Sequence, residues 1–300
     1  MARVGRFKNG AARETYLRAY EAMEPLWPLP SMTVDVPTAF GPTHVRQSGS
    51  GDGLPLVLLH GFGGTGLNWH DVVLGLARDR AVYALDTIGT AGRSVQTAPL
   101  AGDADYGVWF AEVLDGLGLD RVHVLGESQG AWHATLAAVH AADRVASVSL
   151  IEPNGVFTKV PLRVLAKMLR FGANQTDAGW RRMTDWLTPG VTLTDLEWAC
   201  LKAAQGYRPS GGWARPFKDA ELESLAPPVL VIFGAESVIA EPVAARRRLA
   251  EHLPSAEVEI FTGVGHGLRG QIPEQIIERI VAFLALHDRA VHDSAAHRER

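Results

Sequence analysis

Short apolar stretches recur along the chain and alternate with segments of helical periodicity. The apolar stretches are continuous and rich in valine, isoleucine and leucine, which is typical of strands buried on both faces of a parallel sheet. Strands are expected at residues 54–59, 81–85, 121–125, 146–151, 229–233 and 256–261. Helices are expected at residues 69–77, 105–117, 129–141, 242–252 and 273–287. This alternation predicts a doubly wound, mostly parallel α/β sheet.

Three further segments do not follow the alternation. Residues 33–37 and 44–47 predict a hairpin that joins the edge of the sheet. Residues 11–24 predict a short amphipathic helix packed outside the main domain. Between residues 155 and 225 the pattern predicts no strand, only helices at 162–171, 178–187 and 194–207.

These segments predict four regions. The α/β core is expected to comprise residues 33–154 and 226–287, with a helical cap at 155–225 inserted after the sixth strand. An N-terminal helical extension is expected at residues 1–32 and a flexible tail at 288–300. The cap is expected to lie over the carboxyl ends of the strands, where open α/β sheets bind their ligands.

The composition excludes several classes of protein. The 300 residues carry a formal net charge of −4 and no run of five basic residues, so no nucleic-acid partner is expected. A single cysteine, Cys200, cannot form an internal disulfide or a thiolate metal site, and no metal or cofactor is expected. The N-terminal residues lack the apolar segment of a signal peptide, and no apolar run reaches the roughly 18 residues of a membrane span. We therefore expect a cytoplasmic protein without a membrane span.

The sequence RVHVLGESQGA contains a candidate nucleophile, Ser128. Its G-x-S-x-G pentapeptide lies between an expected strand and an expected helix, which is typical of a nucleophile elbow. The glycines permit a sharp turn that exposes the serine hydroxyl, and the following helix directs its positive end at the same point. The alternative is an ordinary glycine-rich turn, and two further motifs argue against it.

The first of these motifs is HGFGG at residues 60–64, directly after an expected strand. It can place the backbone N–H of Phe62 near the elbow. Together with the N–H of Gln129, this donor would form an oxyanion hole. His60 is expected to bond the backbone of its own loop rather than to carry protons.

The second motif is TGVGHG at residues 262–267, which follows the last expected strand. It places His266 on a glycine-rich loop that can reach Ser128 across the strand ends. A histidine there is suited to general-base catalysis, because its ordinary pKa of about 6.5 lies near neutrality.

Taken in order, HGFGG, DTIGTAGRS, GESQG and GVGHG resemble the α/β-hydrolase fold family with a helical cap. The resemblance extends over about residues 33–286, and the segment WPLPSMTVDVPTAFGPTHV resembles a bacterial carboxylesterase-like branch. It implies a site made of the nucleophile Ser128, the base His266, and the oxyanion donors Phe62 and Gln129. It also implies that Asp86, in DTIGTAGRS, braces a loop and has no catalytic role.

The acidic partner of the histidine departs from the family pattern. A histidine base needs a carboxylate that fixes its tautomer and stabilises the imidazolium. In the family the acid follows the strand that here reads VLVIF, at the position of Ser237, and serine cannot carry the charge. Three residues could replace it: Glu152, after the strand at 146–151, Glu236, one position early, and Glu241, near the next helix.

Glu152 is favoured over Glu236, because the end of its strand and its place in the chain order both suit the role. Its alternative roles are to cap the first turn of the cap or to pair with an arginine. Glu241 is the weakest candidate, since a carboxylate at a helix start is already explained by the helix dipole. A site that works without any acid is the remaining alternative.

Together these residues predict a serine hydrolase that cleaves an ester, thioester or lactone through an acyl-enzyme. Half of the eight tryptophans lie in the expected cap: Trp180, Trp186, Trp198 and Trp213. They favour a hydrophobic small-molecule substrate, and the alternative is that they pack the cap onto the main domain. One alternative is an acyltransferase, lyase or cyclase with the same serine and histidine, since one fold hosts many chemistries. Another is a weakly catalytic ligand-binding homologue, which Ser237 alone favours. The sequence leaves open whether the chain forms a homodimer.

Overall fold

The computed structural model describes residues 3–173, 176–210 and 214–298. Its main sheet has eight strands: β2 (Ser31–Val36), β3 (Thr43–Ser48), β4 (Gly53–Leu59), β5 (Arg80–Leu85), β6 (Val122–Glu127), β7 (Val145–Ile151), β9 (Val229–Gly234) and β10 (Glu257–Phe261). They lie in the order β10-β9-β7-β6-β4-β5-β3-β2. Pairing is parallel from β10 to β5, and β3 is antiparallel to both β5 and β2. The expected strands, the edge hairpin and the mostly parallel sheet are confirmed.

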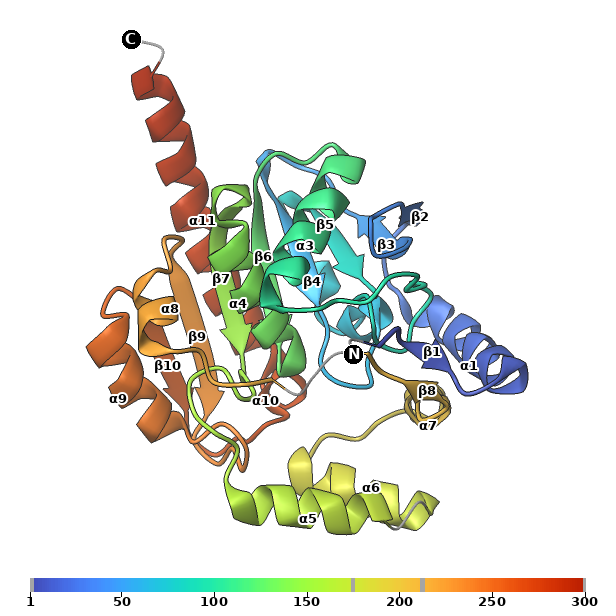
Figure 1. The fold of residues 1–300 in the computed structure, drawn as a ribbon. Helices are drawn as coiled ribbons and strands as arrows, with labels where there is room; N and C mark the ends of the chain where they lie inside the picture. The colour runs from blue at the N-terminus through green and yellow to red at the C-terminus, as the bar shows by residue number, and fades with distance from the viewer. Residues whose placement is uncertain (1–2, 174–175, 211–213, 299–300) are drawn as a thin grey trace.

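Helices cover both faces of the sheet (Figure 1). One face carries α3 (Asp103–Leu117), α4 (Gln129–His140), α8 (Asp219–Glu223) and α9 (Pro242–His252). The other carries α2 (Val73–Leu76), α10 (Leu268–Gln271) and α11 (Pro273–Arg298), with the short turn η2 (Gly66–Trp69). The short turn η3 (Ala142–Arg144) links α4 to β7.

Strand β4 shows why the apolar runs are continuous. Successive side chains of a strand point to opposite faces of its sheet. Val57 and Leu59 pack into the core beneath α3 and α4, whereas Leu56 and Leu58 pack into the core beneath α11. A strand buried on both faces therefore needs apolar residues at consecutive positions, and this is the pattern in the sequence.

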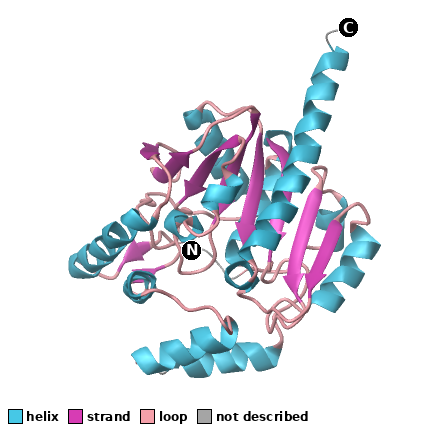
Figure 2. Cartoon of the chain, turned by 180° about the vertical axis from the view of Figure 1, so that it is seen from behind, coloured by secondary structure: helices cyan, strands magenta, loops and turns pink. Residues whose placement is uncertain are grey.

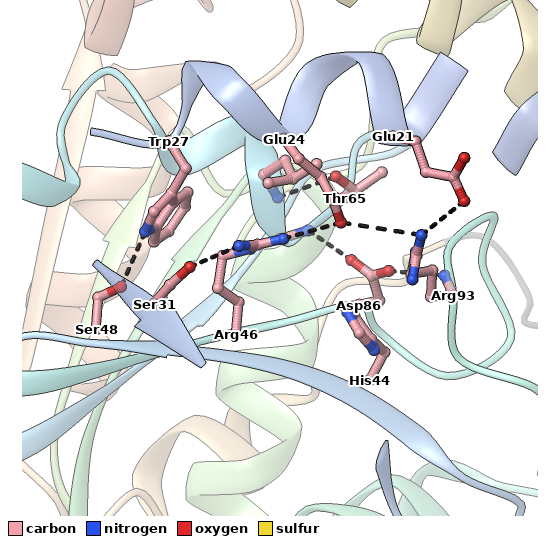
Figure 3. Close-up of polar contacts among 12 residues, drawn as sticks. Glu21, Glu24, Trp27, Ser31, His44, Arg46, Ser48, Thr65, Asp86 and Arg93 are labelled. Carbon is pink, nitrogen blue, oxygen red and sulfur yellow. Dashed lines mark hydrogen bonds and ion pairs between the residues drawn. The ribbon is translucent and has the colours of Figure 1, made fainter. Parts of the chain in front are cut away.

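The N-terminal extension comprises β1 (Arg6–Phe7), α1 (Gly10–Met23) and the turn η1 (Glu24–Leu26). The expectation of a helix packed outside the main domain is wrong, because Tyr16, Tyr20 and Met23 are buried in the same core as strands β4 and β5. Polar contacts also attach the extension to the sheet edge (Figure 3). Arg46 of β3 lies 3.2 Å from Glu24, and the indole of Trp27 donates to Ser48 at 2.9 Å.

The segment between β7 and β9 follows the sixth strand of the main sheet. It contains α5 (Leu162–Ala173), α6 (Asp177–Leu187), α7 (Asp195–Ala204), the short strand β8 (Tyr207–Arg208) and then α8. The expectation of no strand here is wrong, because β8 pairs antiparallel with β1. Helix α8 was also not expected, and its Leu222 is buried in the core beneath α3 and α4. Trp213 lies outside the described residues.

In Figure 1, α5 and α6 lie beyond the carboxyl ends of β7 and β9. Helix α7 lies closer to the N-terminal extension, and α1 packs against it. The tyrosine of β8 contacts the extension as well, since the rings of Tyr207 and Phe7 meet edge-on with centroids 4.9 Å apart. The extension therefore holds α7 and β8 against the core.

Two expected elements differ from the structure. The helix expected at 69–77 is divided into the turn η2 and the single turn α2. The tail expected at 288–300 is helical as far as Arg298, where α11 projects beyond the sheet (Figure 2). Within this supposed tail Asp288 is buried, and it accepts a hydrogen bond from the N–H of Leu54 at 2.9 Å. A buried polar anchor of this kind leaves no apolar periodicity in the sequence.

Candidate active site

Ser128 lies on the sharp turn between β6 and α4, with φ of 53° and ψ of −113°. Its N–H donates to the carbonyl of Ile151 at 2.9 Å. The flanking glycines are required by space, because a Cβ at Gly126 would lie 2.3 Å from the carbonyl oxygen of Gly130. A Cβ at Gly130 would lie 2.0 Å from the carbonyl oxygen of Leu59. The elbow therefore packs directly against the end of β4.

His266 lies on the loop between β10 and α10, and its ring meets Ser128. Its Nε2 is 3.1 Å from Ser128 Oγ, and its Nδ1 is 2.8 Å from Glu152 Oε2. The ring is 7% exposed. The loop crosses closely over the end of β9, where a Cβ at Gly234 would lie 2.5 Å from the carbonyl oxygen of Val264. Glycine at this position lets the histidine reach the elbow.

Glu152 follows β7 directly and is fully buried. Its φ of 47° is unusual for a residue with a side chain, and its N–H donates to Ile232 at 2.9 Å. The carboxylate accepts three hydrogen bonds. Oε1 accepts from the N–H of Gly234 at 2.6 Å, and Oε2 accepts from Ser237 Oγ at 2.5 Å and from His266 Nδ1. A buried carboxylate needs such partners, because desolvation of an unpaired charge is costly.

The other two candidate acids lie elsewhere. Glu236 is exposed, and its backbone N–H donates to the carbonyl of Val264 at 3.0 Å. Glu241 occupies the position before the first turn of α9, with φ of 44°. The structure therefore brings Glu152 to His266, and it places Glu236 and Glu241 in surface and helix-terminal positions.

The HGFGG loop passes beside the elbow. A Cβ at Gly61 would lie 3.4 Å from the Cβ of Ser128 and 4.0 Å from its Oγ. Gln129 is the first residue of α4, so its N–H belongs to the first turn, where helical N–H groups have no intrahelical acceptor. The side chain of Phe62 is 62% exposed and lines the pocket beside the elbow. Both expected donors thus belong to segments that border Ser128.

His60 makes the backbone contacts expected of it. Its Nδ1 lies 2.8 Å from the carbonyl of Gly61, and its Nε2 accepts from the N–H of Thr87 at 3.2 Å. Nδ1 therefore carries the proton of a neutral ring. Burial lowers the pKa of His60, against the raising effect of Asp86. The residue holds two loops together.

Asp86 contacts loop backbone, consistent with the bracing role that the resemblance implies. Its carboxylate accepts from the N–H of Gly66 at 2.8 Å and from the N–H of Arg93 at 2.7 Å. The side chain of Arg93 continues to Glu21 of the N-terminal extension at 2.9 Å (Figure 3). Asp86 therefore links the loop after β5 to the turn η2.

A pocket of about 160 Å³ opens beside the elbow. Its apolar lining comes from the extension, the HGFGG loop and the inserted segment: Met23, Phe62, Leu193, Cys200 and Leu201. Its charged lining comprises Glu127, Glu197 and Arg269. The hydrogen bond with His70 lowers the pKa of Glu197 to about 2. The inserted segment therefore contributes to the wall of this pocket, which also includes Glu127, the residue before Ser128.

Arg269 follows His266 by three residues and joins two carboxylates. Its Nε lies 3.0 Å from Glu127 Oε2, and its guanidinium also pairs with Asp71. Burial opposes the charge of Arg269, but the two carboxylates outweigh it and raise its pKa. The guanidinium lies 5.0 Å from the ring centroid of Trp69. This ion pair connects the elbow to the histidine loop.

Some of these partners were not predicted from the sequence. Ser237 was interpreted only as the loss of an acid, and no role was predicted for Gly234 or Arg269. The position of Ser237 was itself a signal, because a residue at the usual place of the acid is close to the histidine. For Arg269 the only signal in the sequence was its position three residues after His266.

Two other kinds of site are absent from the part of the chain that the structure describes. There, no three or more His, Cys, Asp and Glu side chains are grouped so that they could hold a metal ion. None of the described helices combines the length and the apolar character needed to cross a bilayer. Cys200 is free of disulfides and buried, and burial raises the pKa of its thiol to about 12.

An elbow serine, a histidine and a buried carboxylate meet at the carboxyl ends of a mostly parallel sheet. This combination defines a hydrolase of the α/β-hydrolase class. The sequence pattern of the Alpha/beta hydrolase family matches residues 56–279, and the chain belongs to this family.

Similar proteins refine the class. The chain is 29% identical to carboxylesterase YbfK of Bacillus subtilis over 289 residues, which cover 91% of this chain and 96% of YbfK. It is 27% identical to the uncharacterized carboxylesterase nap of the same organism over 274 residues, which cover 89% of this chain and 91% of nap. These likenesses confirm a carboxylesterase-like hydrolase, as the motifs predicted.

Solved structures agree with this assignment. Naproxen esterase (carboxylesterase NP) from Bacillus subtilis superposes with a TM-score of 0.85 at 26% identity, covering 92% of this chain and 99% of that one. Carboxylesterase CesB (YbfK) superposes with a TM-score of 0.83 at 29% identity, covering 91% and 98%. The likeness extends over nearly the whole chain.

Proposed function

We propose that the chain hydrolyses a carboxylic ester, or a related thioester or lactone, of a hydrophobic small molecule through an acyl-enzyme on Ser128. One observation carries the proposal: Ser128 Oγ lies 3.1 Å from His266 Nε2, while His266 Nδ1 lies 2.8 Å from Glu152 Oε2. The carboxylate can only accept, so Nδ1 holds the proton of the neutral ring and Nε2 is free to take the proton of the serine. The naming of YbfK and nap as carboxylesterases supports ester hydrolysis.

In the first half of the reaction, Ser128 Oγ attacks the carbonyl carbon while its proton moves to His266 Nε2. The imidazolium that forms is stabilised by the charge of Glu152. When the tetrahedral intermediate collapses, the bond to the leaving oxygen breaks and that oxygen takes the proton from Nε2. The acyl group then remains on Ser128 as an ester.

In the second half, water replaces the leaving group. His266 Nε2 takes a proton from the water as its oxygen attacks the acyl carbon, and it returns the proton to Ser128 Oγ as the acid leaves. In both halves the negative oxygen of the intermediate is held by the backbone N–H groups of Phe62 and Gln129. Such donors accelerate the reaction because they act where charge develops. The closeness of Gly61 to Ser128 and the position of Gln129 at the start of α4 support this role.

We infer that the segment at 155–225 acts as a cap that selects hydrophobic substrates. Leu193 and Leu201 of this segment line the pocket beside the elbow together with Phe62. In α5, Leu162, Leu165 and Leu169 lie at helical spacing along one side and are exposed. Apolar side chains in these places favour a ligand that brings apolar surface of its own.

A fluorophosphonate probe tests the proposal directly. The wild-type chain should react once, at Ser128, and should lose its hydrolysis of p-nitrophenyl butyrate in step with labelling. Ser128→Ala should neither react nor hydrolyse the ester. An unlabelled but active wild-type chain would contradict the serine mechanism. If the probe labels Ser128, but the unlabelled chain passes the acyl group of the ester to added alcohols rather than to water, acyl transfer is favoured.

A further inference from the structure

Ser237 lies where the family pattern places the acid. Its side chain contacts the carboxylate of Glu152, the residue that replaces this acid. Its Oγ is 2.5 Å from Glu152 Oε2. The two residues come from different strands, since Glu152 follows β7 and Ser237 follows β9. The position that lost its charge therefore still contacts the candidate site.

The direction of this hydrogen bond is fixed by its surroundings. Ser237 Oγ accepts from the N–H of Ala240 at 3.3 Å. A carboxylate has no proton to give, so the single hydroxyl proton of Ser237 points at Glu152 Oε2. A hydrogen bond to an ionised acceptor is stronger than one between neutral groups.

Ser237 is itself held in place by backbone contacts. Its N–H donates to the carbonyl of Gly234 at 3.1 Å, which closes a tight turn at the end of β9. The N–H of Gly234 donates to the other oxygen of Glu152 at 2.6 Å. One short turn thus presents a donor to each oxygen of the carboxylate.

The oxygen that Ser237 contacts is also the oxygen that faces the histidine. Glu152 Oε2 accepts from Ser237 and from His266 Nδ1. A glutamate has one more rotatable bond than the aspartate common at family sites, and Glu152 enters from a neighbouring strand. Without donors from the β9 turn, its carboxylate could rotate away from Nδ1.

We propose that Ser237 is a positioning residue that holds Glu152 Oε2 against His266 Nδ1, an inference that rests on the proposed function. The donor compensates for the move of the acid from β9 to β7. It also predicts that position 237 remains within reach of the histidine, because its side chain and Nδ1 contact the same oxygen. A carboxylate restored there should be able to serve His266.

The first test removes the donor. Ser237→Ala should lower kcat for p-nitrophenyl butyrate by about tenfold with little change in KM, the fold-change expected for one hydrogen bond to a charged group. Ser237→Thr keeps the hydroxyl and should recover most of the loss. Ser224→Ala, at the end of α8 where the hydroxyl bonds only the carbonyl of Glu221, is the matched control and should retain wild-type kcat.

The second test relocates the acid. Glu152→Gln should lower kcat by on the order of 10³- to 10⁴-fold. Combining it with Ser237→Asp should raise kcat at least tenfold above that of Glu152→Gln alone, since the new carboxylate can take over His266 Nδ1. A structural role of Ser237 predicts no such rescue, because a second substitution in a merely structural turn can only add damage.

The outcomes separate this inference from the proposed function. If the fluorophosphonate fails to label the wild-type chain, the proposed function fails. If Ser128 is labelled, yet Ser237→Ala keeps wild-type kcat and the double variant shows no rescue, only the positioning role is overturned. Thermal unfolding of each variant identifies any that do not fold. If one of these two variants does not fold, the rate at which the fluorophosphonate labels Ser128 in Ser237→Thr is compared with the rate in the wild type instead. Equal labelling rates support positioning by the hydroxyl, and a tenfold slower rate for Ser237→Thr overturns it.

Discussion

The described chain contains two serine–histidine–carboxylate groups, one at each end of the same sheet. They are Ser128–His266–Glu152 and Ser147–His123–Asp288. In the second group His123 Nδ1 lies 2.7 Å from Ser147 Oγ, and Nε2 lies 3.0 Å from Asp288 Oδ1. In both groups the contacts are of hydrogen-bond length, between 2.7 and 3.1 Å, although the two ring nitrogens have exchanged partners.

The two serines differ in backbone and access. Ser147 lies within β7, where it is paired with His123 of β6, and its exposed fraction is 0%. Ser128 lies beyond the end of β6 on a turn with φ of 53°, next to a glycine-rich loop and the N-terminus of α4. An ester could therefore approach the hydroxyl of Ser128 but not that of Ser147. A hydrogen-bonded serine, histidine and carboxylate do not make a catalyst unless substrate can reach the serine and donors can bind the oxyanion.

The two groups also differ in charge. Burial opposes ionisation of Asp288, but hydrogen bonds from His123 and Leu54 and the charge of Arg80 outweigh it, and they hold the pKa of that carboxyl well below its usual range. Burial lowers the pKa of His123, and the contact with Asp288 only partly offsets this. Arg80 pairs with Asp288 at 2.9 Å, so the charge of the carboxylate is already satisfied. This group fastens α11 to the sheet.

The largest expected difference separates the two serines. Ser128→Ala should lower kcat by about 10⁵-fold or more, as expected when a nucleophile is removed. Ser147→Ala should leave kcat within about twofold, because no reacting group contacts it. Hydrolysis of p-nitrophenyl butyrate and fluorophosphonate labelling measure both effects. Comparable losses of kcat in the two variants would contradict the conclusion that only Ser128 acts in catalysis.

The carboxylates should separate activity from stability. Glu152→Gln should lower kcat by on the order of 10³- to 10⁴-fold, whereas Glu236→Gln should have little effect. Asp288→Asn should leave kcat unchanged but lower the free energy of unfolding by roughly 3 kcal/mol, since Arg80 loses its buried partner. Urea unfolding monitored by tryptophan fluorescence, together with initial rates, tests this. A loss of kcat in folded Asp288→Asn would mean that the group of Asp288 influences the candidate active site.

A smaller effect concerns the pH dependence of stability. Burial lowers the pKa of His123 in the native chain, so below about pH 6.5 the unfolded chain takes up a proton there more readily than the native chain does. The unfolded state then binds more protons, so His123 should lower the free energy of unfolding by up to about 1.4 kcal/mol per pH unit as the pH falls from 6.5. Asp288 adds a loss in the same direction only below about pH 3.9.

His123→Asn removes this titration and should give a shallower slope between pH 6.5 and 5 in urea unfolding. The starting stability of the variant does not enter, because the slope is compared rather than the midpoint. Parallel slopes for the variant and the wild type would mean that folding does not lower the pKa of His123.

The smallest effect is expected at Gln129, whose proposed contribution comes from its backbone N–H. Gln129→Ala keeps this donor and should change kcat by less than about threefold, which corresponds to under 1 kcal/mol. A loss of a hundredfold would instead assign the role to the side-chain amide. The second serine group has no counterpart of this donor, because Ser147 lies inside a paired strand.

Much of the fold could be predicted from the sequence, because strands buried on both faces carry continuous apolar runs and the elbow glycines lie in a fixed pattern. Ser128, His266 and Glu152 could be selected because each follows a strand at the same edge of the sheet. The catalytic roles of these residues and of Phe62 and Gln129 stay predictions.

Other features could not be predicted, because their cause lies in tertiary contacts. The pairing of β1 with β8 joins two-residue strands, which carry no periodicity. Asp288 reads as part of a polar tail until β5 and β6 place Arg80 and His123 beside it. Ser237 reads as a loss of function until the turn after β9 directs its hydroxyl at Glu152.

The pairing of β1 with β8 has a consequence for how the chain is made. Arg6 is aligned with Arg208, so the first strand has no partner until some two hundred further residues have been synthesised. At about 5–20 residues per second, this takes roughly 10–40 s on the ribosome. During that time Tyr16 and Tyr20 of α1 also lack helix α7, against which α1 packs in the finished protein. The beginning of the chain therefore cannot complete its contacts before α7 and β8 have been synthesised.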